Sequence, residues 1–276
     1  MKSNLSIEKL KMFNTPRKLM VGLYILRANL RRNHVRPRRT VAKVALYYRI
    51  CDAGYPKEKP AYITKEHCLV NALRAFPMDR VEWHVLGDNI SEDTYCMILR
   101  YLPAEAVKRV SVGNGAGTFR ITYEQAIQQA DDTLVYFLED DYLHIPHSLD
   151  FLTEAAECNY TDYLTLYDHP DKYSNQINPY LTHQGEASTV YWCGHRHWKE
   201  TNSTTMTFAA FADVLKKDKK TFWNWTKGRH PWDFVLFTDL IKMSGRRLSC
   251  PLPSCSTHGE TKGLANSINW QQIALQ

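Results

Sequence analysis

The chain has 276 residues, of which 44% are hydrophobic and 23% are charged, so it is long enough to bury the core of one large α/β domain. It contains no internal repeat and no long low-complexity tract, which excludes repeat arrays and compositionally disordered chains. The net charge of +6 is distributed unevenly, because residues 1–39 carry +10 and the remaining 237 residues carry −4. We therefore predict a basic N-terminal arm over residues 1–40 and a globular domain over residues 41–276 whose acidic balance disfavours nucleic acid as a partner.

Leucines recur at helical spacing within the arm. Leu19, Leu23, Leu26 and Leu30 lie three or four residues apart with Arg and Lys around them, which predicts a basic amphipathic helix over residues 16–32. Two interpretations fit this pattern. The helix either lies on an anionic membrane surface, or it packs its leucine stripe against the rest of the chain or a second subunit.

The arm has no feature of secretion or membrane insertion. Its longest apolar run, residues 19–26, has eight residues, well short of the ~20 that span a bilayer. The seven cysteines form no Cys-x-x-Cys pair, and an odd number cannot all pair within the chain. We therefore expect a cytoplasmic protein, peripheral at the inner face of a membrane where the arm binds lipid.

Apolar segments alternate with helical ones through the first part of the domain. Residues 41–50 predict a buried strand, residues 65–76 a helix, and residues 81–86 a second strand that ends at Gly87-Asp88-Asn89. A helix over about 93–102 and a short strand over 107–112 follow. The glycine-containing loop 113–118 lacks the Lys-Ser/Thr of a P-loop and the spacing of a dinucleotide fingerprint, so we expect a tight turn before a helix over 122–130.

Three consecutive carboxylates, Glu139, Asp140 and Asp141, end the apolar strand predicted over residues 134–138. Mutual repulsion makes such a cluster costly unless water, a cation or a helix end relieves it. The alternation of strands and helices predicts a mainly parallel sheet flanked by helices, in which ligands bind at the carboxyl ends of the strands. Asp88 and the triplet are therefore expected to share one crevice.

This order of motifs resembles the nucleotide-sugar glycosyltransferases of the GT-A fold, and among them the inverting enzymes that build polysaccharides. Residues 87–94 (GDNISEDT) resemble that family's turn after the second strand, Asn114-Gly115 resembles its Asn-Gly loop, and Glu139-Asp140-Asp141 resembles its DxD motif with Glu in place of the first Asp. The resemblance covers residues 41–145. It implies a Rossmann-like GT-A fold with a nucleotide-binding half over residues 41–145 and an acceptor-binding half over residues 146–276.

The resemblance also implies which residues bind the donor. Asp88 would contact the uracil or ribose of a UDP-sugar, with Asn114 beside the nucleotide. Asp141 would bind Mn²⁺ or Mg²⁺, leaving Glu139 and Asp140 for the ribose, the sugar hydroxyls or a metal-bound water. A divalent ion between carboxylate and diphosphate would stabilise the negative charge that develops on the leaving group.

A late histidine is the second candidate metal ligand. Many GT-A enzymes return such a residue to the metal or diphosphate, and His258, followed by Gly259 in a predicted loop, is expected to do so; a surface or packing role is the alternative. Cys193, His195 and His197 suggest zinc, but no second ligand pair at structural-zinc spacing accompanies them, and polar residues on an exposed edge explain them better.

The C-terminal half supplies the candidate general base, Asp233. Pro231 predicts the start of a helix, and an acid in its first turn is favoured by the helix dipole, so a purely structural role is one interpretation. In the other, Asp233 removes the proton of the acceptor hydroxyl while Trp232 stacks on a sugar face. Asp168 and Asp239 remain rivals for the base.

Together these features predict a metal-dependent, inverting glycosyltransferase that extends a surface glycan, with a glycan or lipid-linked glycan as acceptor. A retaining GT-A transferase is the close alternative, because a sequence does not prove a base. A nucleotidyltransferase is less favoured, since the usual Gly-rich loop with basic residues is not found after residues 41–50. A nucleic-acid-binding protein built on the basic arm is the alternative from another class, but no RNA- or DNA-reading motif supports it and we expect no nucleic-acid partner.

Overall fold

The computed structural model describes residues 36–54, 57–175, 178 and 185–276. The chain divides into two units, Met1–Pro37 and Arg38–Gln276. The helix predicted over residues 16–32 lies outside the described residues. All that follows concerns the second unit.

The first half of this unit alternates strands with helices along the chain. Its elements are β1 (Lys43–Cys51), α2 (Lys65–Ala75), β2 (Glu82–Asp88), α3 (Glu92–Leu99), the short 3-10 helix η1 (Ala104–Ala106), β3 (Val107–Val110), α4 (Gly115–Ala126) and β4 (Thr133–Glu139). The four strands are parallel and adjacent in the order β3-β2-β1-β4. The apolar alternation therefore predicts the four strands and the helices α2 and α3, whereas it does not predict η1, and α4 begins earlier than expected.

The second half extends the same sheet on the side of β4. Its elements are β5 (Tyr142–His144), α5 (Ser148–Glu157), β6 (Tyr163–Leu164), η2 (Pro170–Lys172), β7 (Val190–Cys193), β8 (Arg196–Glu200), β9 (Phe208–Phe211), α6 (Ala212–Trp225), α7 (Asp233–Ser244), β10 (Leu248–Leu252), β11 (Ser256–His258), η3 (Thr261–Gly263) and α8 (Trp270–Ala274). The nine-stranded sheet has the order β3-β2-β1-β4-β9-β6-β10-β8-β7. Only β9 and β8 run against their neighbours, so the sheet is mostly parallel, as predicted.

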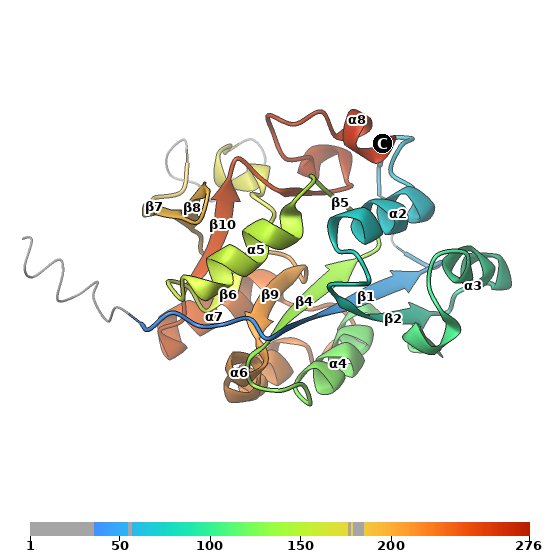
Figure 1. Cartoon of the computed structure of the whole chain (residues 1–276), viewed down its shortest axis with the longest axis horizontal. Helices are drawn as coiled ribbons and strands as arrows, with labels where there is room; N and C mark the ends of the chain where they lie inside the picture. The colour runs from blue at the N-terminus through green and yellow to red at the C-terminus, as the bar shows by residue number, and fades with distance from the viewer. Residues whose placement is uncertain (1–35, 55–56, 176–177, 179–184) are drawn as a thin grey trace, which may run out of the picture. The chain divides into compact units, whose positions relative to one another are not determined.

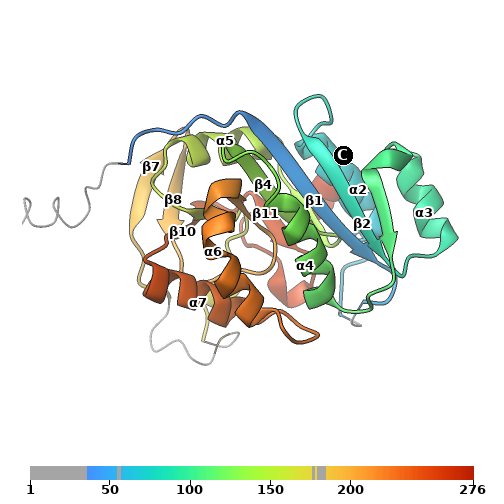
Figure 2. The same ribbon diagram turned by 90° about the horizontal axis from the view of Figure 1, so that it is seen from below.

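Helices cover both faces of the sheet. Figures 1 and 2 show α4, α6 and α7 on one face and α2 and α5 on the other. Aromatic rings fill the layer beneath α4, where fully buried Phe119, Phe137 and Phe208 pack with ring centroids 5.1 to 6.2 Å apart. This packing fixes α4 against β4 and β9, and with them the strand ends that carry the acidic triplet.

The start of α4 differs from the sequence prediction. The helix begins at Gly115, whereas the sequence predicts a turn over residues 113–118 and a helix from 122. The side chain of Asn114 accepts a hydrogen bond from Gly117 N at 2.8 Å and so caps the helix. The two glycines of its first turn conceal this start, because glycine is a poor helix former.

Two further features bear on the localisation prediction. Cys158, at the end of α5, forms a disulfide with Cys193 of β7, which is unexpected for a protein of a reducing compartment. Among the described helices, none has the length and apolar character needed to cross a bilayer.

The disulfide also bears on the zinc hypothesis. It engages Cys193, one of the three residues of the candidate zinc group. The described residues contain no cluster of three metal-binding side chains.

Candidate active site

A cleft of about 900 Å³ opens at the carboxyl ends of β1, β2 and β4. The order β3-β2-β1-β4 reverses direction between β1 and β4, and such a reversal opens a crevice in parallel sheets. Six of the seven predicted site residues line the cleft: Asp88, Asn114, Glu139, Asp140, Asp141 and His258. The expected meeting of Asp88 with the triplet is therefore confirmed.

Asp88 fixes the loop between β3 and α4, which forms one wall of the cleft. Its buried carboxylate accepts hydrogen bonds from Val112 N at 2.6 Å and from Gly113 N at 2.9 Å. These bonds fix the loop between β3 and α4, in which Gly113 has a φ of +71° that glycine adopts without strain. The geometry favours a positioning role for Asp88, while the neighbouring Asn89 also lines the cleft.

Asn114 likewise uses its side chain within the fold. Besides capping α4, its amide nitrogen donates to Val112 O at 3.2 Å. The N-terminus of α4, a twelve-residue helix, borders the cleft, because Gly115 and Thr118 line it. Helix N-termini favour anions because their N–H groups and dipole point outward.

Glu139, the first acid of the triplet, is paired with a buried arginine. Arg49 lies opposite Glu139 in the register of β1 and β4, and its guanidinium lies 3.0 Å from Glu139 Oε1. Arg49 also donates to Gly115 O and Met206 O, both at 3.3 Å. This arginine therefore links the triplet to α4 and to the segment before β9.

Asp140 points toward the end of β1, where its carboxylate accepts from Cys51 N at 3.1 Å. Burial and the neighbouring charge of Asp141 raise the pKa of Asp140 above the usual carboxyl range. Burial also raises the pKa of the Cys51 thiol to about 11, so this cysteine is not a reactive thiolate.

Asp141 and His258 are brought together by strand pairing. Asp141 directly precedes β5, and β11 pairs antiparallel with β5 so that His258 lies opposite Tyr142. Asp141 Oδ2 is 3.3 Å from His258 Nε2 and 2.9 Å from Lys59 Nζ. Burial opposes ionisation of Asp141, but His258 and Lys59 outweigh it and hold its pKa well below the usual range. His258 therefore lies beside the acidic triplet, and its expected role toward a metal or diphosphate stays a prediction.

Lysines occupy the positions around Asp141 and His258 where a metal would bind. Lys59 contacts Asp141, and the Asp141 carboxylate raises the pKa of Lys59 although burial alone would lower it. Lys57 Nζ lies 3.2 Å from His258 Nε2. A divalent ion prefers several oxygen ligands, whereas the described residues form no group of three metal-binding side chains, and Asp141 and His258 each already contact an ammonium group. These residues therefore fit a divalent metal poorly.

Asp233 begins α7 and lies in a smaller pocket of about 350 Å³ formed by residues 228–235. Arg229 and Pro231 of this segment also line the main cleft, and Ala116 N donates to Arg229 O at 3.1 Å. Burial raises the pKa of the Asp233 carboxyl, and the nearby charge of Glu139 raises it further. The pocket of Asp233 thus shares Arg229 and Pro231 with the cleft that the acidic triplet lines.

The rival bases are engaged elsewhere. Asp168 lies 2.9 Å from Lys199 Nζ and accepts from the Tyr173 hydroxyl at 2.6 Å. Asp239 accepts from Trp225 Nε1 at 2.7 Å. These bonds tie both carboxylates to the fold, and Asp233 in turn accepts from Phe234 N at 2.7 Å. Trp232 and Phe234 flank Asp233 with 63% and 54% of their surfaces exposed.

Sequence reasoning missed the basic residues of the cleft. Arg49, Lys57, Lys59, Lys65 and Arg229 all line it. Residues 51–60 form no Gly-rich loop, because Gly54 is their only glycine, but Lys57 and Lys59 do follow β1. The sequence Lys57-Glu58-Lys59 after a predicted strand was the signal that could have revealed them.

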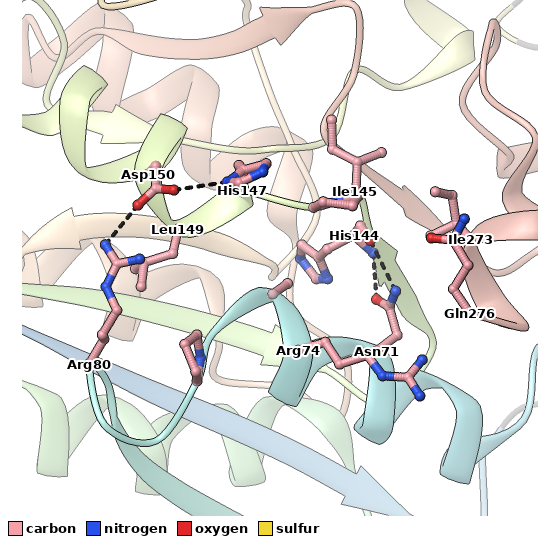
Figure 3. A pocket seen from close by; sticks show the side chains of 13 residues that line it. Asn71, Arg74, Arg80, His144, Ile145, His147, Leu149, Asp150, Ile273 and Gln276 are labelled. Carbon is pink, nitrogen blue, oxygen red and sulfur yellow. Dashed lines mark hydrogen bonds and ion pairs between the residues drawn. The ribbon is translucent and has the colours of Figure 1, made fainter.

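A second cavity of about 240 Å³ lies between the end of α2 and the start of α5 (Figure 3). Its lining includes none of the predicted site residues. Arg80 donates to Asp150 at 2.7 Å, and the side chain of Asn71 exchanges hydrogen bonds with the backbone of His144 (Figure 3). These polar groups stabilise the fold and indicate no ligand.

No protein-family model matches the chain, and no curated protein matches it. Solved structures that are similar include the galactosyltransferase LgtC in complex with donor and acceptor sugar analogs, at 12% identity over 71% of this chain and 69% of that chain, with a TM-score of 0.36. An active-site mutant of LgtC has the same identity and coverage, with a TM-score of 0.39. TarS from S. aureus is 14% identical over 75% of this chain and 35% of that chain, with a TM-score of 0.44. Similarity of this degree does not decide the reaction, which depends on the side chains of the cleft.

Proposed function

We propose that this chain is a glycosyltransferase that moves a sugar from a nucleotide-sugar donor to a glycan acceptor. The observation that carries the proposal is the cleft itself. Acidic and basic side chains meet there at the ends of adjacent parallel strands, and the half-buried carboxylate of Asp233, with exposed aromatic neighbours, lies in a pocket that shares Arg229 and Pro231 with the cleft. A nucleoside diphosphate needs cations and helix N–H groups for its phosphates and carboxylates for its ribose and sugar hydroxyls, and the cleft offers both.

The lining residues suggest an arrangement for the donor. In this proposal Lys57 and Lys59 bind the diphosphate, whereas Asp88 and Asn89, which line the same cleft beside the start of α4, bind the nucleoside. Glu139 and Asp140 are then available for the ribose or the transferred sugar. We propose a uridine-linked donor, following the resemblance of residues 87–94 to the turn that contacts uracil.

Asp233 supplies the base in this proposal. It accepts the proton of the acceptor hydroxyl while that oxygen attacks the anomeric carbon, and the bond from that carbon to the diphosphate breaks with inversion. The exposed rings of Trp232 and Phe234 hold the acceptor sugar beside it. Retention is the alternative stereochemistry, and the anomeric configuration of the product, read by NMR, decides between them.

The metal dependence expected from the sequence is tested separately, because Asp141 and His258 fit a divalent ion poorly. Mn²⁺ or Mg²⁺ would take Asp141 and His258 as its ligands from this chain, and it would have to displace Lys59 from Asp141. The transfer step described above relies only on groups of this chain. Titration of activity with each ion after treatment with a chelator measures the requirement.

Nucleotide selectivity tests the proposal most directly. Because a ligand that binds only the folded chain raises its melting temperature, UDP is expected to stabilise the protein more than GDP, CMP or dTDP. Transfer is then assayed with UDP-sugars and glycan or lipid-linked glycan acceptors. Absence of stabilisation by every nucleotide, with and without Mn²⁺, would contradict the proposal.

A nucleotidyltransferase is the second candidate, because Lys57 and Lys59 give the loop after β1 the charge that such an enzyme uses on a nucleoside triphosphate. It would release pyrophosphate from UTP and a sugar 1-phosphate. A glycosyltransferase would instead release UDP from the UDP-sugar. Measuring both products with the same preparation separates the two functions.

A further inference from the structure

We infer that Lys57 and Lys59, rather than a divalent metal ion, neutralise the donor diphosphate; this inference rests on the proposed sugar-transfer function. The two ammonium groups contact the same pair of atoms that would have to hold a metal. Lys59 Nζ is 2.9 Å from Asp141 Oδ2, Lys57 Nζ is 3.2 Å from His258 Nε2, and Oδ2 and Nε2 are 3.3 Å apart. A divalent ion placed between Oδ2 and Nε2 would be repelled by two positive charges within a few ångströms.

The acidic side chains of the cleft are engaged before any donor arrives. Asp88 accepts backbone N–H groups, Glu139 pairs with Arg49, and Asp141 pairs with Lys59. Lys57 differs from these, because its contacts are the imidazole of His258 and Glu260 at 3.9 Å. Lys57 therefore lacks the close carboxylate contact that Lys59 makes with Asp141. A bound diphosphate would supply the negative charge that Lys57 lacks.

Both ammonium groups are accessible from the cleft. The side chains of Lys57 and Lys59 are 36% and 30% exposed, and both residues line the cavity. An ammonium group has three N–H donors. The contact with Asp141 uses one donor of Lys59, and the contact with His258 uses at most one of Lys57, so donors remain for phosphate oxygens.

The backbone between the two lysines is held in place. Glu58 O accepts hydrogen bonds from Thr261 N at 2.9 Å and from Thr261 Oγ1 at 3.0 Å. Thr261 follows β11, the strand that carries His258. The lysines and the histidine thus belong to one connected structure, and charge held in position before reaction costs little reorganisation during it.

This arrangement completes the transfer chemistry. As the bond between the anomeric carbon and the β-phosphate oxygen breaks, its electron pair stays on that oxygen, where the two ammonium groups stabilise the developing charge. The acceptor oxygen forms the new bond, and its proton passes to Asp233. Atoms and charge balance with no metal as a reactant.

The test is calorimetric titration of the full-length protein with UDP, first in EDTA and then in Mn²⁺. We expect wild-type binding in EDTA to be within twofold of that in Mn²⁺. Lys57→Met and Lys59→Met should each weaken binding in EDTA about tenfold, the loss typical of one hydrogen bond to a charged group. Lys59→Arg should retain most of the affinity. Lys216→Met is the matched control, because Lys216 is 38% exposed and pairs with Asp131 at 2.6 Å outside the cleft.

Circular dichroism and melting temperature establish that each variant is folded. If Lys59→Met fails to fold, Lys57→Met and Lys59→Arg carry the test. Wild-type binding that tightens tenfold or more with Mn²⁺ overturns the inference, as does binding in EDTA that is insensitive to both lysines. Either result leaves sugar transfer intact, whereas failure to bind UDP, GDP, CDP or dTDP under any condition overturns the proposed function instead.

Discussion

Among single residues, Asp233 is the one proposed as the general base. Asp233→Asn should lower kcat at least a hundredfold and leave the affinity for UDP within twofold, because a general base acts on the acceptor proton in the transition state. Asp239→Asn is the matched control, since Asp239 bonds only to Trp225 Nε1 in the described contacts. Unchanged turnover with a lower melting temperature would show that Asp233 only begins the helix.

The pH dependence of turnover tests the surroundings of the same carboxyl. Burial and the charge of Glu139 raise the pKa of Asp233, and a base must be deprotonated to act. Turnover should therefore fall as the pH decreases through a value above the usual carboxyl range. Glu139→Gln removes the nearby negative charge and should move this acidic limb to lower pH. An acidic limb that stays in place in Glu139→Gln contradicts the electrostatic contact.

Gly259 controls how closely β11 approaches the acidic triplet. A Cβ atom at this position would lie 2.7 Å from Asp141 O and 2.5 Å from Ile63 Cγ2. Gly259→Ala should therefore displace His258, cost about 1–3 kcal/mol of stability and weaken UDP binding. Gly54→Ala is the control, because no described atom lies within 4 Å of its added methyl group. Equal melting temperatures for the two variants would show that the strand accommodates the methyl group.

The sequence predicts the acidic residues of the cleft but not its lysines. The acids at the strand ends could be predicted, because each follows an apolar run and parallel strands bring such ends together. Lys57 and Lys59 look like ordinary surface lysines in the sequence. Their role follows from Thr261 and His258, which lie about 200 residues away along the chain and contact this loop.

At the scale of elements, hydrophobic period predicts helices and strands better than it predicts where they begin. The strands β1, β2 and β4 follow the apolar pattern closely, because each buries several apolar residues, and α2 buries Cys68, Leu69, Ala72 and Ala75 at helical spacing. The short β3 buries none of its four residues. α4 does not follow the pattern, since its first turn consists of small residues and its cap is the polar Asn114. The pairing of β11 with β5 joins two three-residue strands that are too short to have a recognisable period.

The cap of α4 can be tested by substitution. Asn114→Ala removes the acceptor of Gly117 N and should cost about 1 kcal/mol of stability, whereas Asn114→Asp should retain the cap. Because the start of this helix borders the cleft, Asn114→Ala should also weaken UDP binding. Asn269→Ala is the control, since Asn269 caps the short α8 outside the cleft lining. If both variants bind UDP equally well, the α4 terminus does not contact the donor.

For the whole molecule, the open question is whether the basic N-terminal arm binds an anionic membrane. Residues 1–37 carry a charge of +8, opposite in sign to the −4 of residues 40–276, and the predicted helix over residues 16–32 belongs to them. A lipid-linked acceptor would place the substrate at a membrane surface, where a basic amphipathic helix gains roughly 1 kcal/mol per cation from anionic lipid. The Cys158–Cys193 disulfide counts against a reducing compartment, so lipid binding has to be tested independently of localisation.

Sedimentation with vesicles decides between the two interpretations of the arm. The full-length protein should sediment with vesicles that contain phosphatidylglycerol at low salt, and it should be released at high salt, because screening weakens the attraction of surface charges. A shortened chain that begins at Arg38 should not sediment. It keeps the contacts of Arg39 with Asp213 at 2.8 Å and with the ring of Phe211, so its fold should be preserved. Equal sedimentation of both chains would contradict membrane binding by the arm, and aggregation of the shortened chain alone would indicate that the leucine stripe instead covers apolar surface of the protein.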